Sequence, residues 1–188
     1  MKLILIRHGN TEANEKHLYC GSTDLPLSHA GKAALLERKA AAGIPLAEGF
    51  RILTSGMRRC EETLSLLYGE VPHETDAAFR EMDCGAFEMR SYEEMKTDPA
   101  YIAWISGNNE ANVCPGGESG EIMTARVVKG LEKLMADGRD SLLVTHGGVI
   151  AAIMTYLFPE EGKNRYEWQP KPGGGYAIDL AAKTWRGV

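Results

Sequence analysis

The stretch Leu3-Ile4-Leu5-Ile6-Arg7-His8-Gly9 decides the fold prediction for this chain. Its four apolar residues predict a buried strand, and the three residues after them stand where that strand opens into a loop. Ligands of α/β proteins bind at the loop ends of parallel strands. A guanidinium holds an anion through a planar fork of donors, and an imidazole can act as a nucleophile. The stretch therefore predicts an α/β sheet with phosphate chemistry at its edge.

Two further strand ends carry related side chains. The run Arg51-Ile52-Leu53 leads into a segment that contains Arg59, and the run from Ser141 to Thr145 leads into His146. The first strand end thus presents an arginine and a histidine, the second presents an arginine, and the third presents a histidine. We expect these groups to surround one bound oxyanion.

The rest of the chain alternates between helical and strand patterns. This alternation predicts a single-domain, three-layer α/β/α sandwich over residues 1–188, with a mostly parallel sheet and helices on both faces. The individual predictions are a helix from a Ser28 cap to about Ala42, a helix after Met57, a short helix at Ser91, a helix from Ser119 to about Asp137 with Gly138 as its stop, a buried helix from Val149 to Phe158, a surface loop from Gly162 to Gly175, and a last strand from Tyr176 to Leu180.

The composition of the chain argues against several classes of function. A net charge of −5 argues against a general nucleic-acid or anionic-membrane surface. No apolar stretch is long enough to cross a bilayer, and Leu3–Ile6 is too short for the core of a secretory signal, so we expect a cytoplasmic protein. The four cysteines lack Cys-x-x-Cys spacing and predict free thiols, with no zinc site.

Six motifs follow one another in a fixed order along the chain. They are Arg7-His8-Gly9 with Thr11 and Asn14; Cys20 to Leu27 with Gly31; Thr54-Ser55-Gly56-Met57-Arg58-Arg59 with Thr63; Phe79-Arg80-Glu81; Pro115-Gly116-Gly117-Glu118-Ser119; and Val144-Thr145-His146-Gly147-Gly148. In content and order they resemble the histidine phosphatase superfamily, also called the phosphoglycerate mutase-like group, branch 1. The resemblance spans almost the whole chain.

The resemblance implies a metal-independent and cofactor-independent phosphomonoester hydrolase. His8 attacks phosphorus to form a phosphohistidine, which water then hydrolyses. Its attacking nitrogen must be unprotonated, so we expect the other ring nitrogen to donate to a backbone carbonyl and the nearby guanidinium groups to lower the pKa of His8. The groups expected to bind the phosphate oxygens are Arg7, Arg59 and His146, with Asn14 and the backbone around Gly147 as further donors. Arg58, next to Arg59, is expected to point outward.

The same resemblance assigns the general acid to Glu81. Its carboxyl gives a proton to the leaving oxygen and, once ionised, activates water for dephosphorylation. Asp83 and Glu88 are the rival candidates for this role.

The substrate is expected to be a small phosphorylated metabolite. The region between Glu81 and His146 is short compared with that of phosphoglycerate mutases, and no basic cluster lies between Tyr101 and Glu118, which favours a phosphatase over a mutase. The second and fifth motifs are similar to those of α-ribazole phosphatases, which suggests α-ribazole 5'-phosphate. Further substrate contacts are predicted at Gly21, Ser22, Glu118 and Ser119. A mutase, or a noncatalytic phospholigand-binding module, are the alternatives.

Two positions depart from the family pattern. Many relatives have proline where this chain has Gly56, which predicts a less rigid approach to Arg59. Where phosphatases of this group often show Trp-Glu-Gly, this chain reads Phe87-Glu88-Met89. The missing glycine predicts a changed turn at Met89.

Overall fold

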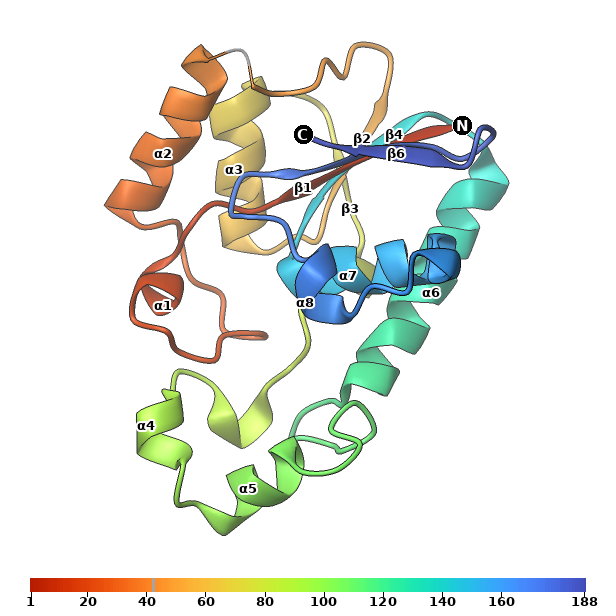
Figure 1. Cartoon of the computed structure of the whole chain (residues 1–188). Helices are drawn as coiled ribbons and strands as arrows, with labels where there is room; N and C mark the ends of the chain where they lie inside the picture. The colour runs from red at the N-terminus through yellow and green to blue at the C-terminus, as the bar shows by residue number, and fades with distance from the viewer. Residues whose placement is uncertain (42) are drawn as a thin grey trace.

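In the computed structural model, which describes residues 1–41 and 43–188, a six-stranded sheet forms the centre of the molecule (Figure 1). Its strands are β1 (Lys2–Arg7), β2 (Arg51–Thr54), β3 (Glu74–Thr75), β4 (Ser141–Thr145), β5 (Gly175–Asp179) and β6 (Thr184–Gly187). Their order in the sheet is β3-β2-β4-β1-β5-β6. The pairs among β1, β2, β3 and β4 are parallel, whereas β5 and β6 pair antiparallel. The predicted mostly parallel sheet is confirmed.

Alternate side chains of β1 enter two separate cores, because successive residues of a strand point to opposite faces. Leu3 and Leu5 belong to a core formed with α6 (Gly120–Asp137) and α7 (Gly147–Leu157). Ile4 and Ile6 belong to the core on the other face, formed with α2 (His29–Ala40) and α3 (Arg58–Tyr68). Each such buried side chain contributes about 1.5–3 kcal/mol. The predicted three layers, with helices on both faces, are therefore present.

The predicted helix caps are largely confirmed. Ser28 and Ser119 accept the amides of Gly31 and Ile122, and Gly138 ends α6 in the left-handed conformation with φ of 72°. Ser91 forms a capping box with Glu94 before α4 (Tyr92–Met95). The helix expected to run to about Ala42 ends at Ala40, and position 42 itself lies outside the described residues. The helix predicted from Val149 begins two residues earlier, at Gly147, and ends at Leu157.

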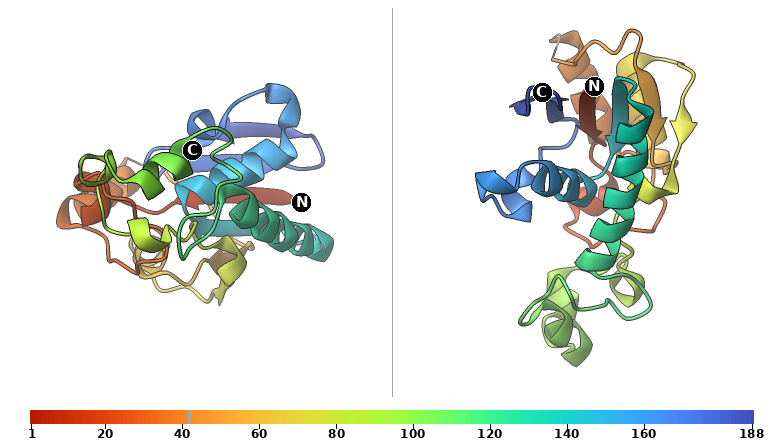
Figure 2. Two further views of the ribbon diagram at one scale, coloured as in Figure 1. Left: turned by 90° about the horizontal axis from the view of Figure 1, so that it is seen from below. Right: turned by 90° about the vertical axis from the view of Figure 1, so that its right-hand side faces the viewer.

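Residues 83–118, here called the cap segment, leave the sheet between β3 and α6. They carry α4, α5 (Pro99–Ile105) and a 3-10 turn, Gly85–Phe87, and they lie apart from the sheet in two perpendicular views (Figures 1 and 2). A second 3-10 turn, Ala77–Phe79, precedes them. The cap segment has a small core of its own, built from Phe87, Met95, Tyr101 and Cys114, with Tyr19 and Trp104 against it.

Two predictions near the C-terminus are wrong. The strand expected as the last one is β5, and a further strand, β6, pairs with it as a hairpin. The sequence signal for β6 is weak because Thr184–Gly187 is a short edge strand with a single large apolar residue. The predicted loop after Gly162 contains a one-turn helix, α8 (Arg165–Trp168), which follows the 3-10 turn Pro159–Glu161.

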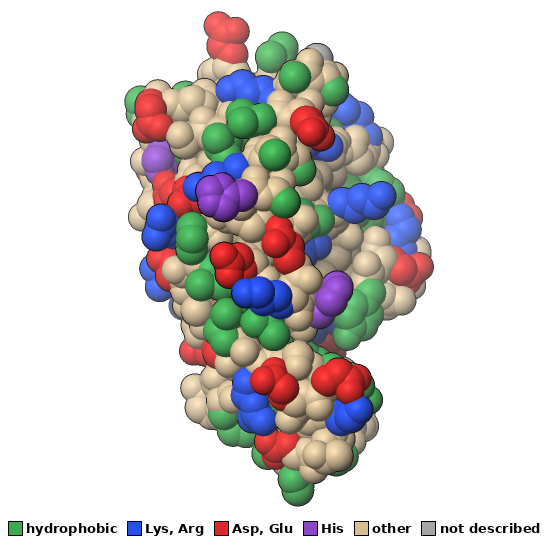
Figure 3. Space-filling view, turned by 90° about the vertical axis from the view of Figure 1, so that its left-hand side faces the viewer, with side chains coloured by type: hydrophobic (Ala, Val, Ile, Leu, Met, Phe, Trp, Pro, Cys, Tyr) green, Lys and Arg blue, Asp and Glu red, His purple; other side chains and the backbone are tan. Residues whose placement is uncertain are grey.

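Acidic and basic side chains are interspersed with apolar ones over the face that carries α2 (Figure 3). Along residues 1–41 and 43–188, no helix has both the length and the apolar character needed to cross a membrane. All four cysteines are free thiols, as predicted, and Cys60, Cys84 and Cys114 are buried.

Candidate active site

Two strand ends bring the candidate histidines together. β1 and β4 pair in parallel with Arg7 opposite Thr145, so the next residue of each chain segment, His8 and His146, emerges at the same edge. Their ring centroids lie 5.2 Å apart at 64°. β2 pairs with β4 on the other side, and the helix that follows it, α3, carries Arg59 in its first turn.

His8 is held as a neutral base with a defined tautomer. Its side chain is buried, and Nδ1 lies 2.7 Å from the Gly9 carbonyl oxygen, which can only accept, so Nδ1 carries the proton. Nε2 therefore keeps its lone pair and has no hydrogen-bond partner among the described residues. The pKa of His8 is lowered to about 3, chiefly by burial and then by the positive charge of Arg59, with a smaller decrease from Arg7, while the hydrogen bond to Gly9 opposes them. The expected tautomer is thus present.

Thr63 fixes the backbone that aims His8. Its hydroxyl accepts the Gly9 amide at 3.0 Å and donates to the Arg59 carbonyl at 2.7 Å, joining the β1 loop to α3. A side chain at Gly9 would lie 2.7 Å from Leu35 Cδ1, so the loop packs directly on α2. Thr63 belongs to the third sequence motif, but this role was not predicted from the sequence.

Arg59 is 1% exposed and donates from every nitrogen of its guanidinium. Nε donates to His146 Nδ1 at 3.2 Å, Nη1 to the Thr23 carbonyl at 2.9 Å and Nη2 to the Gly21 carbonyl at 2.7 Å. A guanidinium has five N–H groups, so two remain for an anion. Arg58 points outward as predicted and pairs with Glu62 at 3.0 Å.

His146 is fully buried, and both of its ring nitrogens have partners within the protein. Nδ1 accepts from Arg59, which leaves the proton on Nε2, and Nε2 donates to Ser55 Oγ at 2.9 Å. Burial, followed by the charge of Arg59, lowers the pKa of His146 well below its usual value. In this arrangement His146 orients Arg59, whereas the sequence predicted that it donates to the phosphate. The motif did not reveal this because Ser55 comes from a different strand end.

Arg7 retains an unused donor. Nη1 donates to the Pro170 carbonyl at 2.8 Å, while Nε is buried and makes no hydrogen bond within the described part of the chain. Leaving such a donor unpaired costs about 1–3 kcal/mol. A side chain at Gly147 would lie 3.1 Å from Arg7 Cζ, so the guanidinium rests on the first turn of α7. An anion here can satisfy this donor together with the free first-turn amide of Gly147.

Glu81 lies at the N-terminus of α7. Its Oε2 accepts the Gly148 amide at 3.0 Å, and its Oε1 accepts the Met82 amide at 3.0 Å. A Cβ on residue 148 would overlap Glu81 Oε1, so any side chain at this position would displace the carboxyl group. Arg126 Nη2 donates to the Glu81 backbone carbonyl at 2.9 Å.

Glu118 and Ser119 have internal partners. Glu118 accepts from Arg126 Nη2 at 2.7 Å and from the Asp83 amide at 3.1 Å, and the buried Ser119 caps α6. Their side chains therefore support the Glu81 loop and α6, and the structure does not present them as the substrate contacts expected from sequence.

Glu88 organises the loop at residues 21–23. It accepts the amides of Gly21, Ser22 and Thr23 and the Thr23 hydroxyl. Burial raises the pKa of Glu88, but the hydrogen bonds from Thr23 and the amides outweigh it and lower the pKa overall. Glu88 is thus a poor proton donor near neutral pH. Gly21 and Ser22 contact Glu88, and Gly21 also holds Arg59, so their observed role is to position other groups.

The remaining candidates are Asp83 and Asn14. Asp83 accepts from the Ser22 hydroxyl and the Gly85 amide, both at 2.8 Å. Asn14 uses Oδ1 to accept the amide and hydroxyl of Thr11 at 3.0 Å each, and its NH₂ has no partner within the described residues. Asn14 therefore has two N–H groups left for an anion.

Comparisons with known proteins identify the family of this chain. The family model of the histidine phosphatase superfamily (branch 1) matches residues 3–188. The adenosylcobalamin/alpha-ribazole phosphatase of Salmonella typhimurium is 30% identical over 96% of this chain and 91% of that protein. A 2,3-bisphosphoglycerate-dependent phosphoglycerate mutase of Cytophaga hutchinsonii is 31% identical over 82% and 76%. The crystal structure of the alpha-ribazole phosphatase from Shigella flexneri superposes with a TM-score of 0.82 at 27% identity, covering 98% of this chain and 93% of that one. The chain therefore belongs to branch 1 of the histidine phosphatase superfamily.

Proposed function

We propose that residues 1–188 form one phosphomonoester hydrolase domain, which acts in the cytoplasm on a small phosphorylated metabolite through a phosphohistidine at His8. The observation that carries this proposal is the Nδ1 contact with the Gly9 carbonyl, which leaves a lone pair on Nε2. A neutral imidazole with a fixed tautomer is ready to attack phosphorus without first losing a proton.

In the first step Nε2 of His8 forms a bond to phosphorus while the ester P–O bond breaks. The ring gains positive charge, which the Gly9 carbonyl stabilises through Nδ1. Glu81, in its protonated form, gives its proton to the departing oxygen. In the second step the Glu81 carboxylate takes a proton from water, the resulting oxygen attacks phosphorus, and the P–N bond breaks to restore neutral His8.

Positive charge around the phosphoryl group is the second requirement. Arg7 offers Nε, Arg59 offers two remaining N–H groups, and Asn14 and the Gly147 amide add neutral donors. These groups are held in place before the reaction, so they stabilise the charge on the transferred oxygens at little cost in reorganisation. His146 contributes by fixing the orientation of Arg59.

A phosphatase is favoured over a mutase by the pairing of nearby cations. Arg126 and Arg165, which border the Glu81 side of the site, form ion pairs with Glu118 and Glu110 at 2.7 and 2.6 Å. A mutase must also hold a second anionic group of its substrate. The names of the relatives support α-ribazole 5'-phosphate as the first substrate to test.

The test measures inorganic phosphate released from phenyl phosphate and from α-ribazole 5'-phosphate, with a chelator present. We expect turnover by the natural sequence, an acid-labile phosphoryl group on His8, and a loss of at least about 10³-fold in kcat for His8→Ala. His29→Ala, at an exposed position on α2, is the control. Appreciable turnover by His8→Ala would contradict the proposal. Transfer of phosphate between positions of one molecule would identify a mutase, and stabilisation by phosphate without turnover on a wide panel would identify a binding module.

A further inference from the structure

A groove of about 580 Å³ lies between α6, α7 and α8. It begins at Gly148 in the first turn of α7, and the side chains along it are mainly apolar. They include Met123 and Val128 from α6, Ala151 and Ala152 from α7, and Tyr156 and Tyr166 at its rim. Because residues 148, 152 and 156 are spaced four apart, the groove follows one face of α7 for about two turns.

Glu81 lies beside Gly148, the residue at the head of this groove. The Gly148 amide donates to Glu81 Oε2, and the missing side chain of Gly148 is what makes room for Oε1. In an in-line displacement the leaving oxygen lies opposite the attacking Nε2 of His8, and its proton donor must touch it. The rest of the leaving group therefore continues from Glu81 past Gly148, where the groove starts.

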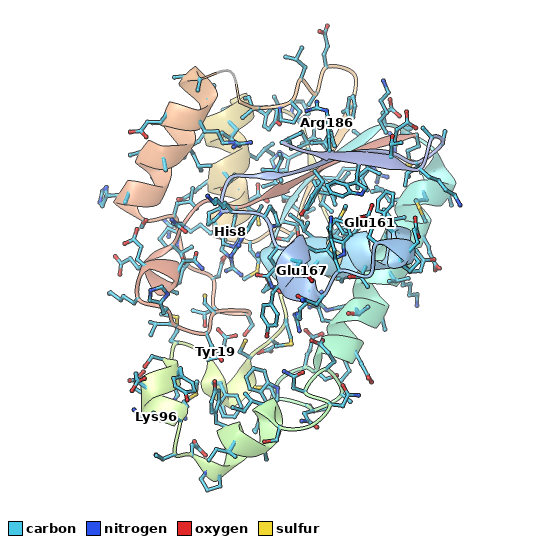
Figure 4. The ribbon with its side chains drawn as sticks, viewed as in Figure 1. His8, Tyr19, Lys96, Glu161, Glu167 and Arg186 are labelled. Carbon is cyan, nitrogen blue, oxygen red and sulfur yellow. The ribbon has the colours of Figure 1, made fainter. Side chains whose placement is uncertain are left out.

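Tyr166 lines the groove from α8, and Tyr19 lies against the core of the cap segment. Tyr19 packs against the cap segment, with its hydroxyl 2.7 Å from that of Tyr101, and Tyr166 projects from α8 with 72% of its surface exposed. Burial and the hydrogen bond with Tyr101 raise the pKa of Tyr19. Figure 4 shows Tyr19 between His8 and the cap segment, with α8, marked by Glu167, to the right of His8.

The charges on the groove are already compensated. Arg165 pairs with Glu110 at 2.6 Å. Lys163 lies over the rings of Trp168 and Trp185, at 4.3 and 4.2 Å from their centres, and 3.5 Å from Glu161. Each cation that lines the groove thus has a partner, and an anionic leaving group would gain no unshared positive charge.

We propose that this groove is the leaving-group subsite and that it takes an uncharged, ring-bearing leaving group. The inference rests on the proposed phosphatase function. Apolar walls stabilise a ring by about 25 cal/mol for each Å² removed from water, and the rim phenols add face or edge contacts.

The test compares phenyl phosphate with 4-biphenylyl phosphate, whose leaving phenols are similar in acidity but differ in length. We expect the natural sequence to show kcat/KM at least about tenfold higher for the longer ester, as the added ring is buried. A third ester, 4-carboxyphenyl phosphate, should lose this advantage because it carries an anion into the groove.

Two neighbouring residues provide a matched pair of variants. Thr124 lines the groove, whereas Ala125 is exposed on the outer side of α6. Thr124→Phe should abolish the preference for the longer ester, while Ala125→Phe should preserve it. Tyr166→Ala, at an exposed position that does not endanger folding, should lower the preference several-fold.

Three outcomes would overturn the inference: equal kcat/KM for the two neutral esters, equal preferences for Thr124→Phe and Ala125→Phe, or no effect of Tyr166→Ala. If Thr124→Phe does not fold, as judged by circular dichroism, the Tyr166→Ala result decides. Failure of the proposed function itself would look different, since no phosphate would then be released from phenyl phosphate by the natural sequence.

Discussion

Glu88 and Arg59 are connected through one short segment of backbone. Glu88 Oε1 accepts the Gly21 amide at 2.9 Å and Oε2 accepts the Thr23 amide at 3.2 Å, while the carbonyls of the same two residues accept Nη2 and Nη1 of Arg59 at 2.7 and 2.9 Å. An acidic side chain outside the reaction centre thus sets the position of a buried guanidinium inside it.

Removing the charge of Glu88 should weaken phosphate binding. In Glu88→Gln the amide NH₂ faces backbone donors in place of an acceptor, so the loop at residues 21–23 shifts and Arg59 loses alignment. We expect KM for phenyl phosphate to rise about tenfold, with equal losses for good and poor leaving groups. Steady-state kinetics on a series of substituted phenyl esters measures this.

Glu81→Gln supplies the contrast for that series. Loss of a proton donor slows the hydrolysis of esters with poor leaving groups most, because good leaving groups need little protonation. We expect the rate to fall by about 10²–10⁴-fold. If Glu88→Gln shows this leaving-group dependence and Glu81→Gln does not, the two roles are exchanged.

Gly148→Ala should reduce activity while preserving stability. The added methyl overlaps Glu81 Oε1 and displaces the carboxyl group, yet alanine is the better residue inside a helix by roughly 0.5–1 kcal/mol. We expect kcat to fall at least about tenfold with the melting temperature unchanged within a few degrees. The control is Gly187→Ala in β6, where a Cβ meets no atom within 4 Å. Unchanged kcat for Gly148→Ala would remove the argument that Glu81 depends on this contact.

Met89→Gly should stabilise the fold slightly. Met89 has φ of 59°, a left-handed conformation that costs a side-chain-bearing residue about 1–2 kcal/mol and glycine almost nothing. Part of this gain is offset by the greater freedom of glycine in the unfolded chain, so the expected increase in the free energy of unfolding is about 0.5 kcal/mol. Glu93→Gly, in helix α4, should instead lose about 1 kcal/mol. Urea denaturation of the two variants checks both signs.

The low pKa of His8 predicts a specific dependence of stability on pH. The folded state keeps His8 neutral down to a pKa of about 3, whereas the unfolded chain binds a proton near 6.5. The unfolded state therefore binds more protons between these values, so this contribution is fully present above pH 6.5 and is lost as the pH falls toward 3. His8→Asn should show a shallower loss of stability across that range than the natural sequence. Identical slopes for His8→Asn and the natural sequence would contradict the assignment.

Local signals in the sequence predicted the parts of the fold that local chemistry determines. The serine caps at Ser28, Ser91 and Ser119 are short-range hydrogen bonds, so their residue types and spacing are visible in the chain. The apolar run of β1 was visible for the same reason. β6 was missed because an exposed edge strand needs little apolar patterning. The helix α8 was also missed, although the capping box formed by Asn164 and Glu167 was a signal for it in the sequence.

The histidines and arginines of the site were predictable because each follows a strand end. The groups that position them were harder to see, because they act across long stretches of chain. Ser55 reaches His146 from β2, and Thr63 reaches Gly9 from α3. The two departures from the family pattern could also be explained only from the structure. Gly56 has φ of 74°, which proline cannot adopt, and Met89 keeps a turn that suits glycine.

The unpaired Nε of Arg7 has a consequence for the catalytic cycle. Any tetrahedral oxyanion that reaches this nitrogen relieves its burial penalty, and free inorganic phosphate does so as well as an ester. The enzyme should therefore be subject to competitive inhibition by its own product, with an affinity that falls when Arg7 is replaced by lysine, whose single ammonium group lacks an Nε donor at that place.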